Sequence, residues 1–160
     1  MHAYFEDYIE RFAELISDFH KAIDDLPVEA LDWVLGEDMN TLCVLVVHVC
    51  DAARYWVGDV ALAEESGRDR AAEFAAQGWT LAQLKAKLDE TEVYIRVGVA
   101  RLTLDDLARM CPAPGRRVRP DSDELRQFRL GWSLLHALEH TALHLGHAQI
   151  TRQLWDQRQN

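Results

Sequence analysis

Four of the seven histidines of this 160-residue chain fall in one window near its end, at His136, His140, His144 and His147. On an α-helix, which turns by about 100° per residue, the four side chains project within an arc of about 80°. Histidines four residues apart have Cβ atoms about 6 Å from each other, so two imidazoles can bind one divalent metal ion. The spacing therefore predicts a metal site on this helix, although it does not choose between the pairs.

Two ligands on one helix leave a metal site incomplete, so a third ligand is expected from a facing helix. His48 is the leading candidate because it lies in the apolar run 42–50. A buried imidazole without a partner costs about 1–3 kcal/mol, so His48 needs a metal ion or another partner, such as a carbonyl group or Tyr55. The histidine row on the last helix favours the metal ion. His2 and His20 are interpreted as ordinary terminal or rim histidines.

The segment from His136 to His140 also matches the inverted zincin pattern H-x-x-E-H, in which Glu139 would be the general base of a peptidase. That chemistry needs a carboxylate ligand downstream, and no glutamate follows Glu139 in the sequence. On a helix, Glu139 also projects about 100° away from His140. Both observations disfavour a peptidase.

Four other polar residues have two interpretations each. Asp51, one helical turn after His48, can orient an imidazole or act as a fourth ligand, but it can equally be a surface aspartate. Three arginines are candidate hooks for a substrate carboxylate, because a guanidinium pairs with that group through two hydrogen bonds. A solvated helix face is the simpler interpretation for each of them, namely Arg54, Arg129 and Arg152.

The elements that must position these residues are helices, because helical periodicity dominates the sequence. The apolar residues predict four long helices, at about 5–26, 41–65, 81–102 and from somewhere in 121–129 to about 156. Asn40 is expected to cap the second, and Thr80 with Gln83 makes a capping-box pattern before the third. Residues 103–122 hold three of the four prolines and are expected to be irregular, with no strand. The sequence thus predicts an all-α four-helix bundle that forms a single domain over residues 1–160.

Composition and charge exclude several classes of function. Asp and Glu outnumber Lys and Arg by 27 to 17, and the net charge of -10 would repel nucleic acids and anionic membranes. The three cysteines do not suggest a disulfide framework, and Cys43 and Cys50 share one apolar helix face as core residues. The acidic N-terminus is unlike a signal peptide, and the longest apolar run is about half a membrane span. We therefore expect a cytoplasmic protein without nucleic-acid or membrane partners.

Several segments together resemble the DinB-like (YfiT-type) superfamily of bacterial metal-binding four-helix bundles. The aromatic amphipathic first helix is one. Another is Met39–Thr41, which opens a helix whose His48 is followed eight residues later by Trp56. A third is 69–74, with the sequence DRAAEF, and the most specific is 135–147, with the sequence LHALEHTALHLGH. The resemblance covers nearly the whole chain.

The resemblance implies both a fold and a metal site. The fold is an up-down-down-up bundle that is often a homodimer. The H-x-x-x-H motif of the family falls on His140 and His144, and its second-helix histidine falls on His48. These three residues would bind zinc or nickel together with water, while His136 and His147 would be supporting or packing residues.

The resemblance also implies candidate reactions. Characterised relatives include metal-dependent transferases and isomerases that use low-molecular-weight thiols such as mycothiol or bacillithiol. Three histidines with an open coordination position are typical of catalytic zinc, which activates a thiol or a water molecule. The expected function is a metal-dependent S-transferase that acts on a small-molecule substrate with such a thiol. A non-catalytic metal-binding or dimeric interaction module and a small-molecule metal-dependent hydrolase are the alternatives, and no catalytic residue is identified.

Overall fold

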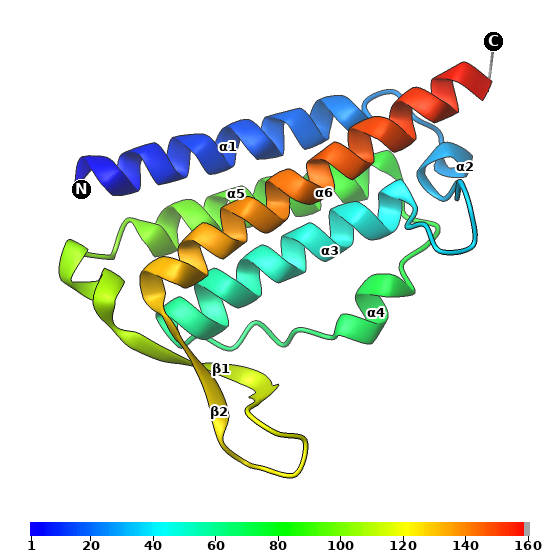
Figure 1. The fold of residues 1–160 in the computed structure, drawn as a ribbon. Helices are drawn as coiled ribbons and strands as arrows, with labels where there is room; N and C mark the ends of the chain where they lie inside the picture. The colour runs from blue at the N-terminus through cyan, green and yellow to red at the C-terminus, as the bar shows by residue number, and fades with distance from the viewer. Residues whose placement is uncertain (159–160) are drawn as a thin grey trace.

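The computed structural model describes residues 1–158 of the chain. Four long helices lie side by side around the hydrophobic core (Figure 1): α1 (Ala3–Ile23), α3 (Leu42–Arg54), α5 (Leu81–Val99) and α6 (Leu130–Arg158). Helix α1 packs against α5 and α6, and α3 packs against the same two helices. The mostly helical fold confirms the all-α prediction, with one small sheet as the exception.

Local sequence signals account for where the helices begin. Helix α1 buries a single stripe of aromatic and aliphatic side chains, as its periodicity predicts. Thr80 and Gln83 form the predicted capping box at the start of α5. The cap predicted for α3 was wrong by one residue, because the hydroxyl group of Thr41, and not Asn40, accepts a hydrogen bond from the N–H of Val44. An N-cap side chain accepts a hydrogen bond from the backbone N–H two or three residues later in the chain, and Val44 is three residues after Thr41.

The helix predicted at 41–65 does not stay α-helical. After α3 the chain continues as a π-helical segment, η1 (Tyr55–Leu62), and it ends at Ala63 in the left-handed conformation, with φ of 56°. π-Helical turns are rare and often occur at functional sites. Gly58 within η1 lies so close to the hydroxyl group of Tyr94 that a Cβ atom would overlap it. A larger residue at this position would therefore force the side chain of Tyr94 to move.

The stretch expected to be irregular contains a β-hairpin, so the prediction of no strand was wrong. Strand β1 (Met110–Arg117) pairs antiparallel with β2 (Leu125–Arg129), and the ladder is irregular between Pro112 and Arg117. The prolines do not prevent pairing, because both strands of a two-stranded sheet are edge strands whose outward N–H groups need no partner. The hairpin projects from one end of the helices (Figure 1). Helix α6 consequently begins at Leu130, just after the range expected for its start.

Three short helices complete the described chain: α2 (Val28–Leu31), α4 (Arg70–Phe74) and the 3-10 helix η2 (Leu104–Ala108). Helix α4 packs against α3. Its first turn is capped by the carboxylate of Asp69, which accepts hydrogen bonds from the N–H groups of Ala71 and Ala72. This short helix matters for the site because it brings its own side chains to the middle of α3.

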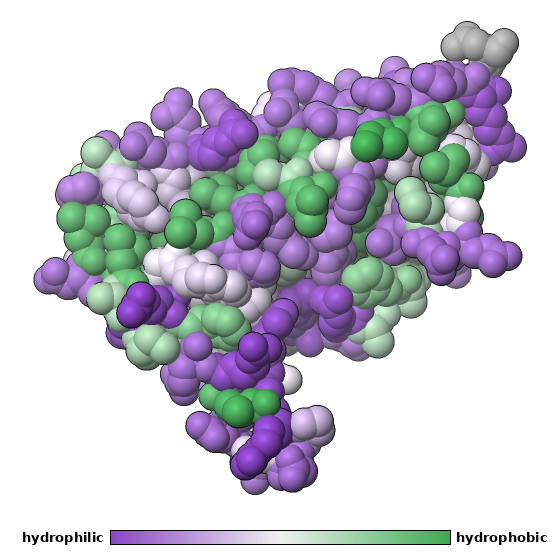
Figure 2. Space-filling model, viewed as in Figure 1, coloured by the Kyte–Doolittle hydropathy of each residue, from purple (hydrophilic) through white to green (hydrophobic). Residues whose placement is uncertain are grey.

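The surface is mixed in polarity. Figure 2 shows charged and polar residues over much of the face on which α6 lies, with hydrophobic patches along the path of that helix. Within residues 1–158, no helix combines the length and the apolar character needed to cross a bilayer.

Candidate metal centre

The three histidines named as ligands converge between two helices. His48 comes from α3, and His140 and His144 come from successive turns of α6. One ring nitrogen atom of each residue lies within 4.8 Å of one nitrogen atom of the other two. The ring centroids are 4.9 Å apart for His48 and His140, 5.0 Å for His48 and His144, and 4.5 Å for His140 and His144. Three residues separated by up to 96 positions in the sequence thus form one compact group.

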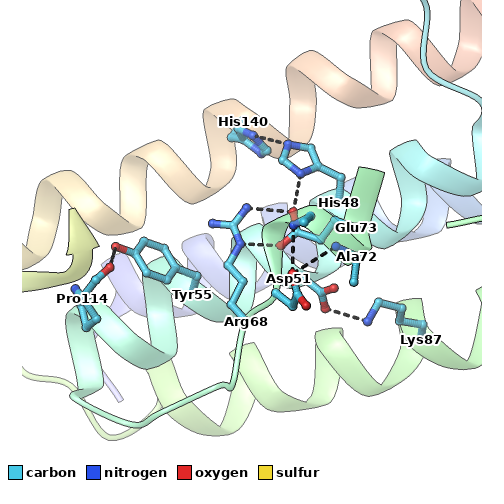
Figure 3. Close-up of polar contacts among 11 residues, drawn as sticks. His48, Asp51, Tyr55, Arg68, Ala72, Glu73, Lys87, Pro114 and His140 are labelled. Carbon is cyan, nitrogen blue, oxygen red and sulfur yellow. Dashed lines mark hydrogen bonds and ion pairs between the residues drawn. The ribbon is translucent and has the colours of Figure 1, made fainter. Parts of the chain in front are cut away.

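Hydrogen bonding fixes the ring of His48, which is 3% exposed. Its Nδ1 atom lies 2.7 Å from Oε2 of Glu73, and its Nε2 atom lies 3.2 Å from Nε2 of His140 (Figure 3). An ionised carboxylate only accepts hydrogen bonds, so Nδ1 carries the proton and the lone pair of Nε2 faces His140. Two nitrogen ligands of a tetrahedral zinc ion, each about 2.0–2.1 Å from it, lie about 3.3 Å apart. The observed separation suits ligands of one ion.

Glu73 is the buried carboxylate that orients His48. The residue is 1% exposed and lies in α4. It accepts two hydrogen bonds from Arg68, from Nε to Oε1 at 2.5 Å and from Nη2 to Oε2 at 3.0 Å. Burial raises the pKa of Glu73, but the hydrogen bonds from Arg68 and His48 outweigh burial, so the pKa lies below its ordinary value. A carboxylate behind a metal-binding imidazole holds the ring in place and raises the basicity of its other nitrogen.

All three imidazoles are held in the neutral form. Burial, followed by the neighbouring histidines, lowers the pKa of His140 to about 3 and the pKa of His144 to about 4. Burial also lowers the pKa of His48, although Glu73 opposes it. A metal ion binds the neutral imidazole and competes with protons for it. At neutral pH these ligands therefore need not lose a proton before they bind.

The donor set fits a divalent metal ion. Among residues 1–158, Nδ1 of His144 is buried and has no hydrogen-bond partner. Buried polar atoms are normally paired, so an unpaired ring nitrogen points to a group outside the protein's own hydrogen bonds. Zinc and nickel both accept neutral imidazole ligands.

Two further histidines of α6 flank the group. His136 stacks on Trp132, with ring centroids 4.8 Å apart and an angle of 10° between the rings. The ring of the exposed His147 lies 5.4 Å from that of His144. These contacts agree with the packing or supporting role that the resemblance implies for both residues.

The remaining candidates from the sequence patterns lie at the surface. His20 is 2.8 Å from the exposed Asp89, and His2 caps α1 through its ring nitrogen. The side chain of Glu139 is 81% exposed. A general base beside a metal ion would lie against the site, so the structure gives no support to the peptidase interpretation.

Asp51 has a different partner from the one considered in the sequence. Its Oδ1 atom accepts a hydrogen bond from Nζ of Lys87 on α5 at 2.6 Å (Figure 3). The role of orienting the His48 ring belongs instead to Glu73. Tyr55, the alternative partner considered for His48, donates its hydroxyl proton to the carbonyl oxygen of Pro114 at 2.8 Å.

Five other residues singled out in the sequence are not part of the three-histidine group. Arg152 forms ion pairs with two aspartates, and the guanidinium of Arg54 lies 4.7 Å above a tyrosine ring. Arg129 is exposed at the end of β2. Cys43 and Cys50 are buried, and burial raises the pKa of their thiols to about 11 and about 12. The prediction that these two cysteines are core residues is confirmed.

Sequence reasoning missed Glu73 and Arg68. The segment 69–74 entered only as part of the family resemblance, and neither residue was assigned a role. The available signal was weak: a glutamate between two alanines and a phenylalanine, in a region expected to be a polar connection. Glu73 lies 25 residues from His48 in the chain, and side-chain spacing within a helix cannot connect residues that far apart.

Fold and site together define a helical-bundle protein with a compact three-histidine cluster between two helices. The family model of the DinB superfamily matches residues 11–148, and the chain belongs to that superfamily. No curated protein matches the sequence significantly.

Solved structures from three bacteria share the fold. A DinB-like protein from Bacillus cereus ATCC 10987 is similar with a TM-score of 0.73 at 13% identity, covering 94% of this chain and 92% of its own. A conserved protein from Enterococcus faecalis has a TM-score of 0.69 at 12% identity, with 93% and 95% covered. An uncharacterized protein from Clostridium difficile 630 has a TM-score of 0.64 at 14% identity, with 96% and 95% covered. At these identities the similarity concerns the fold alone.

Proposed function

We propose that this DinB superfamily protein binds one divalent metal ion, zinc or nickel, through His48, His140 and His144, and that it is a metal-dependent S-transferase using a low-molecular-weight thiol. The observation that carries the proposal is the convergence of three imidazoles whose ligand atoms lie within 4.8 Å of one another. Three protein ligands leave a fourth position of a tetrahedral site for water or substrate, which is the arrangement of catalytic zinc sites.

A bound divalent ion supplies Lewis acidity and lowers the pKa of a thiol or water at its open position. The protein holds the ligands in place for this chemistry. Glu73 accepts a hydrogen bond from Nδ1–H of His48 and so leaves the Nε2 lone pair free, and the hydrogen bonds from Arg68 keep Glu73 ionised. A transfer reaction then requires an electrophilic substrate bound beside the thiol sulfur.

We also propose that the four long helices follow the up-down-down-up order implied by the family resemblance. Near the starts of α1 and α6, Tyr8 donates a hydrogen bond to the carbonyl oxygen of Leu134 at 3.1 Å. Near the ends of the same helices, Arg152 donates to Asp25 at 3.0 Å. These contacts support parallel directions for α1 and α6. The course of α3 and α5 in Figure 1, which both return from the end where α1 finishes, supports the two opposite directions between them.

Metal content tests the site. Elemental mass spectrometry of tag-free protein is expected to find about one zinc or nickel ion per chain in the wild type and a large loss in His144→Ala. His20→Ala is the control, because it removes a histidine that pairs with Asp89 and is not part of the three-histidine group, and it should keep the metal. An empty wild type after incubation with both metals, or equal losses in the two variants, would refute the three-histidine site.

Turnover tests the reaction. Metal-loaded protein is incubated with bacillithiol or mycothiol and an electrophile such as monobromobimane, and the loss of thiol above the uncatalysed rate is measured. The proposal expects a faster rate with wild type and no acceleration with a folded His144→Ala variant. Consumption of an ester without a thiol would indicate the hydrolase instead.

A second candidate is a non-catalytic dimeric module, which the surface of α6 favours. Leu135, Leu143 and Ile150 lie on one side of this helix and are exposed by 58%, 59% and 53%. Figure 2 shows hydrophobic patches along the same helix. Single exposed leucines are ordinary, but a row of them suits an interaction surface. On this reading the wild type sediments as a homodimer that Leu143→Glu dissociates, and His144→Ala lowers metal content and Tm without any turnover to lose.

A further inference from the structure

A cleft with a volume of about 700 Å³ is lined by Arg68, Arg70 and Arg116. Its walls come from η1, from the segment that leads into α4 and from the tip of β1. Small-molecule sites typically have volumes of about 300–1,000 Å³. The size of the cleft therefore suits a small ligand.

Aromatic rings hold two of the guanidinium groups in place. The guanidinium of Arg68 lies 5.1 Å from the ring centroid of Tyr55, and that of Arg116 lies 5.8 Å from the same ring and 4.7 Å from the ring of Trp56. The hydrogen bond from Tyr55 to Pro114 joins the π-helical segment to the hairpin (Figure 3). A guanidinium stacked on a ring keeps its N–H donors available in the plane of the group.

The three arginines differ in their partners. Arg68 donates both of its observed hydrogen bonds to Glu73. Arg70 lies 4.9 Å above the ring of Phe74, and neither Arg70 nor Arg116 forms an ion pair with a carboxylate within residues 1–158. A guanidinium without a carboxylate can bind an oxyanion through two parallel hydrogen bonds.

The cleft also lies close to the histidines. Arg70 rests on Phe74, and the ring of Phe74 lies 4.8 Å from that of His48. Arg116 rests on Trp56, whose ring is 4.7 Å from that of His136 in the histidine row of α6. Each of these guanidinium groups is thus separated from a histidine by one aromatic ring.

We propose that this cleft binds the carboxylate or phosphate group of a small molecule through Arg70 and Arg116. Two carboxylates also line the cleft, those of Asp59 and Glu65, and the chain has a net charge of -10. Both features oppose the binding of anions, and they oppose a polyanion such as a nucleic acid more strongly than a small molecule with one anionic group. The interpretation of the cleft as the substrate site of the transferase rests on the proposed function. The interpretation of the cleft as an anion site depends only on the arginines.

Binding of small anions tests the proposal. Succinate and inorganic phosphate are titrated at constant ionic strength into 15N-labelled protein, and amide chemical shifts give both the affinity and the location. Succinamide is the neutral control for succinate. Saturable shifts are expected around Gly115 and Arg70 with at least one of the two anions, and the better probe distinguishes a carboxylate from a phosphate ligand.

Variants assign the binding to the arginines. Arg116→Gln and Arg70→Gln are each expected to weaken binding about tenfold or more, since a charge-assisted hydrogen bond is lost. Arg117→Gln is the matched control, because Arg117 is the next residue of the hairpin and pairs with Asp123 outside the cleft. Equal effects of the Arg116 and Arg117 variants, equal shifts with succinamide, or no saturable shift would overturn the proposal.

The same titration in His144→Ala separates this inference from the proposed function. Arginine-dependent anion binding that persists without the metal supports the cleft whether or not the transferase proposal holds. Anion binding that requires the metal and ignores Arg116→Gln would mean that the anion binds the ion directly, which would overturn the arginine site while leaving the metal site intact.

Discussion

Replacing Glu73 with glutamine removes the negative charge behind His48 and keeps the shape of the side chain. In the wild type, both carboxylate oxygens accept hydrogen bonds, from Nδ1 of His48 and from Arg68. A glutamine amide has one oxygen and one NH2 group, so it cannot accept at both positions that the carboxylate oxygens occupy, and at least one of the three hydrogen bonds is lost. If the amide NH2 group faces His48, the ring is driven to the tautomer with its proton on Nε2, and the lone pair that faces His140 is lost. If the amide NH2 group faces Arg68 instead, it lies against an N–H group of the guanidinium, and neither donor has an acceptor there.

The substitution should lower both the free energy of unfolding and the affinity for zinc. Glu73 is 1% exposed and the side chain of Arg68 is 10% exposed, so water replaces the lost bond poorly. One buried donor without an acceptor costs about 1–3 kcal/mol, and the free energy of unfolding should fall by that amount. Loss of a carboxylate behind a metal-binding histidine typically lowers metal affinity about 10- to 100-fold. We expect an effect of this size on zinc binding by Glu73→Gln.

Competition with a fluorescent zinc chelator measures the Kd, and urea unfolding of the metal-free protein measures the free energy of unfolding. Glu64→Gln is the matched control, because Glu64 also accepts hydrogen bonds from an arginine and a second side chain, Arg101 and Tyr94, but lies away from the histidines. It should leave the Kd unchanged. A Glu73→Gln protein that is less stable yet binds zinc as tightly as the wild type would show that Glu73 supports the fold without orienting His48.

Three further outcomes follow from the same contacts. Asp51→Asn should change zinc affinity less than twofold and stability by less than about 1 kcal/mol, because Asp51 pairs with a partly exposed lysine; a large loss of zinc would place it in the site. Thiol titration of the folded protein at pH 8 should detect no reactive Cys50, whose pKa is raised by burial to about 12, and rapid labelling would contradict its buried position. The free energy of unfolding of the metal-free protein should be highest above about pH 6.5 and should decrease as the pH falls toward 4. The folded state lowers the pKa values of His140 and His144, so the unfolded chain binds protons at a higher pH than the folded protein does. A flat profile of Tm between pH 7 and pH 4.5 would refute this last expectation.

The long helices were predictable because each has a strong local signal. The apolar stripe of α1 and the capping box of Thr80 and Gln83 depend only on residues within a few positions of each other. The π-helical turns of η1 were not predicted, because the apolar residues of this segment continue the pattern of α3 and suit a buried helix of either kind. The hairpin was missed because Pro112 and Pro114 are usually signs of irregular chain, and only the pairing with β2 makes them part of a strand.

The candidate site also has one part that could be predicted from the sequence and one part that could not. The face shared by His140 and His144 follows from helical geometry, and the apolar surroundings of His48 indicate that its ring is buried and needs a partner. The identity of the carboxylate behind His48 does not follow from either argument. Asp51 is the nearest acidic residue along the helix, but its carboxylate faces Lys87, whereas Glu73 reaches the ring from a separate short helix. Tertiary packing of α4 against α3 decides this choice, and no spacing in the sequence records it.

Arg68 connects the histidine group with the cleft. Its Nε and Nη2 atoms bind Glu73, its guanidinium lies against Tyr55, and the same side chain lines the cleft wall. A substitution of Arg68 would therefore disturb the carboxylate behind His48 and the anion site together, and its effects could not be assigned to either. Arg116 lies against the rings of Tyr55 and Trp56 and lines the cleft, and within residues 1–158 it forms no ion pair with Glu73, so its replacement tests anion binding without removing the support of His48. For the same reason, an anion that binds near Arg68 is positioned to act on the site through Glu73, and zinc affinity measured with and without succinate would report that coupling.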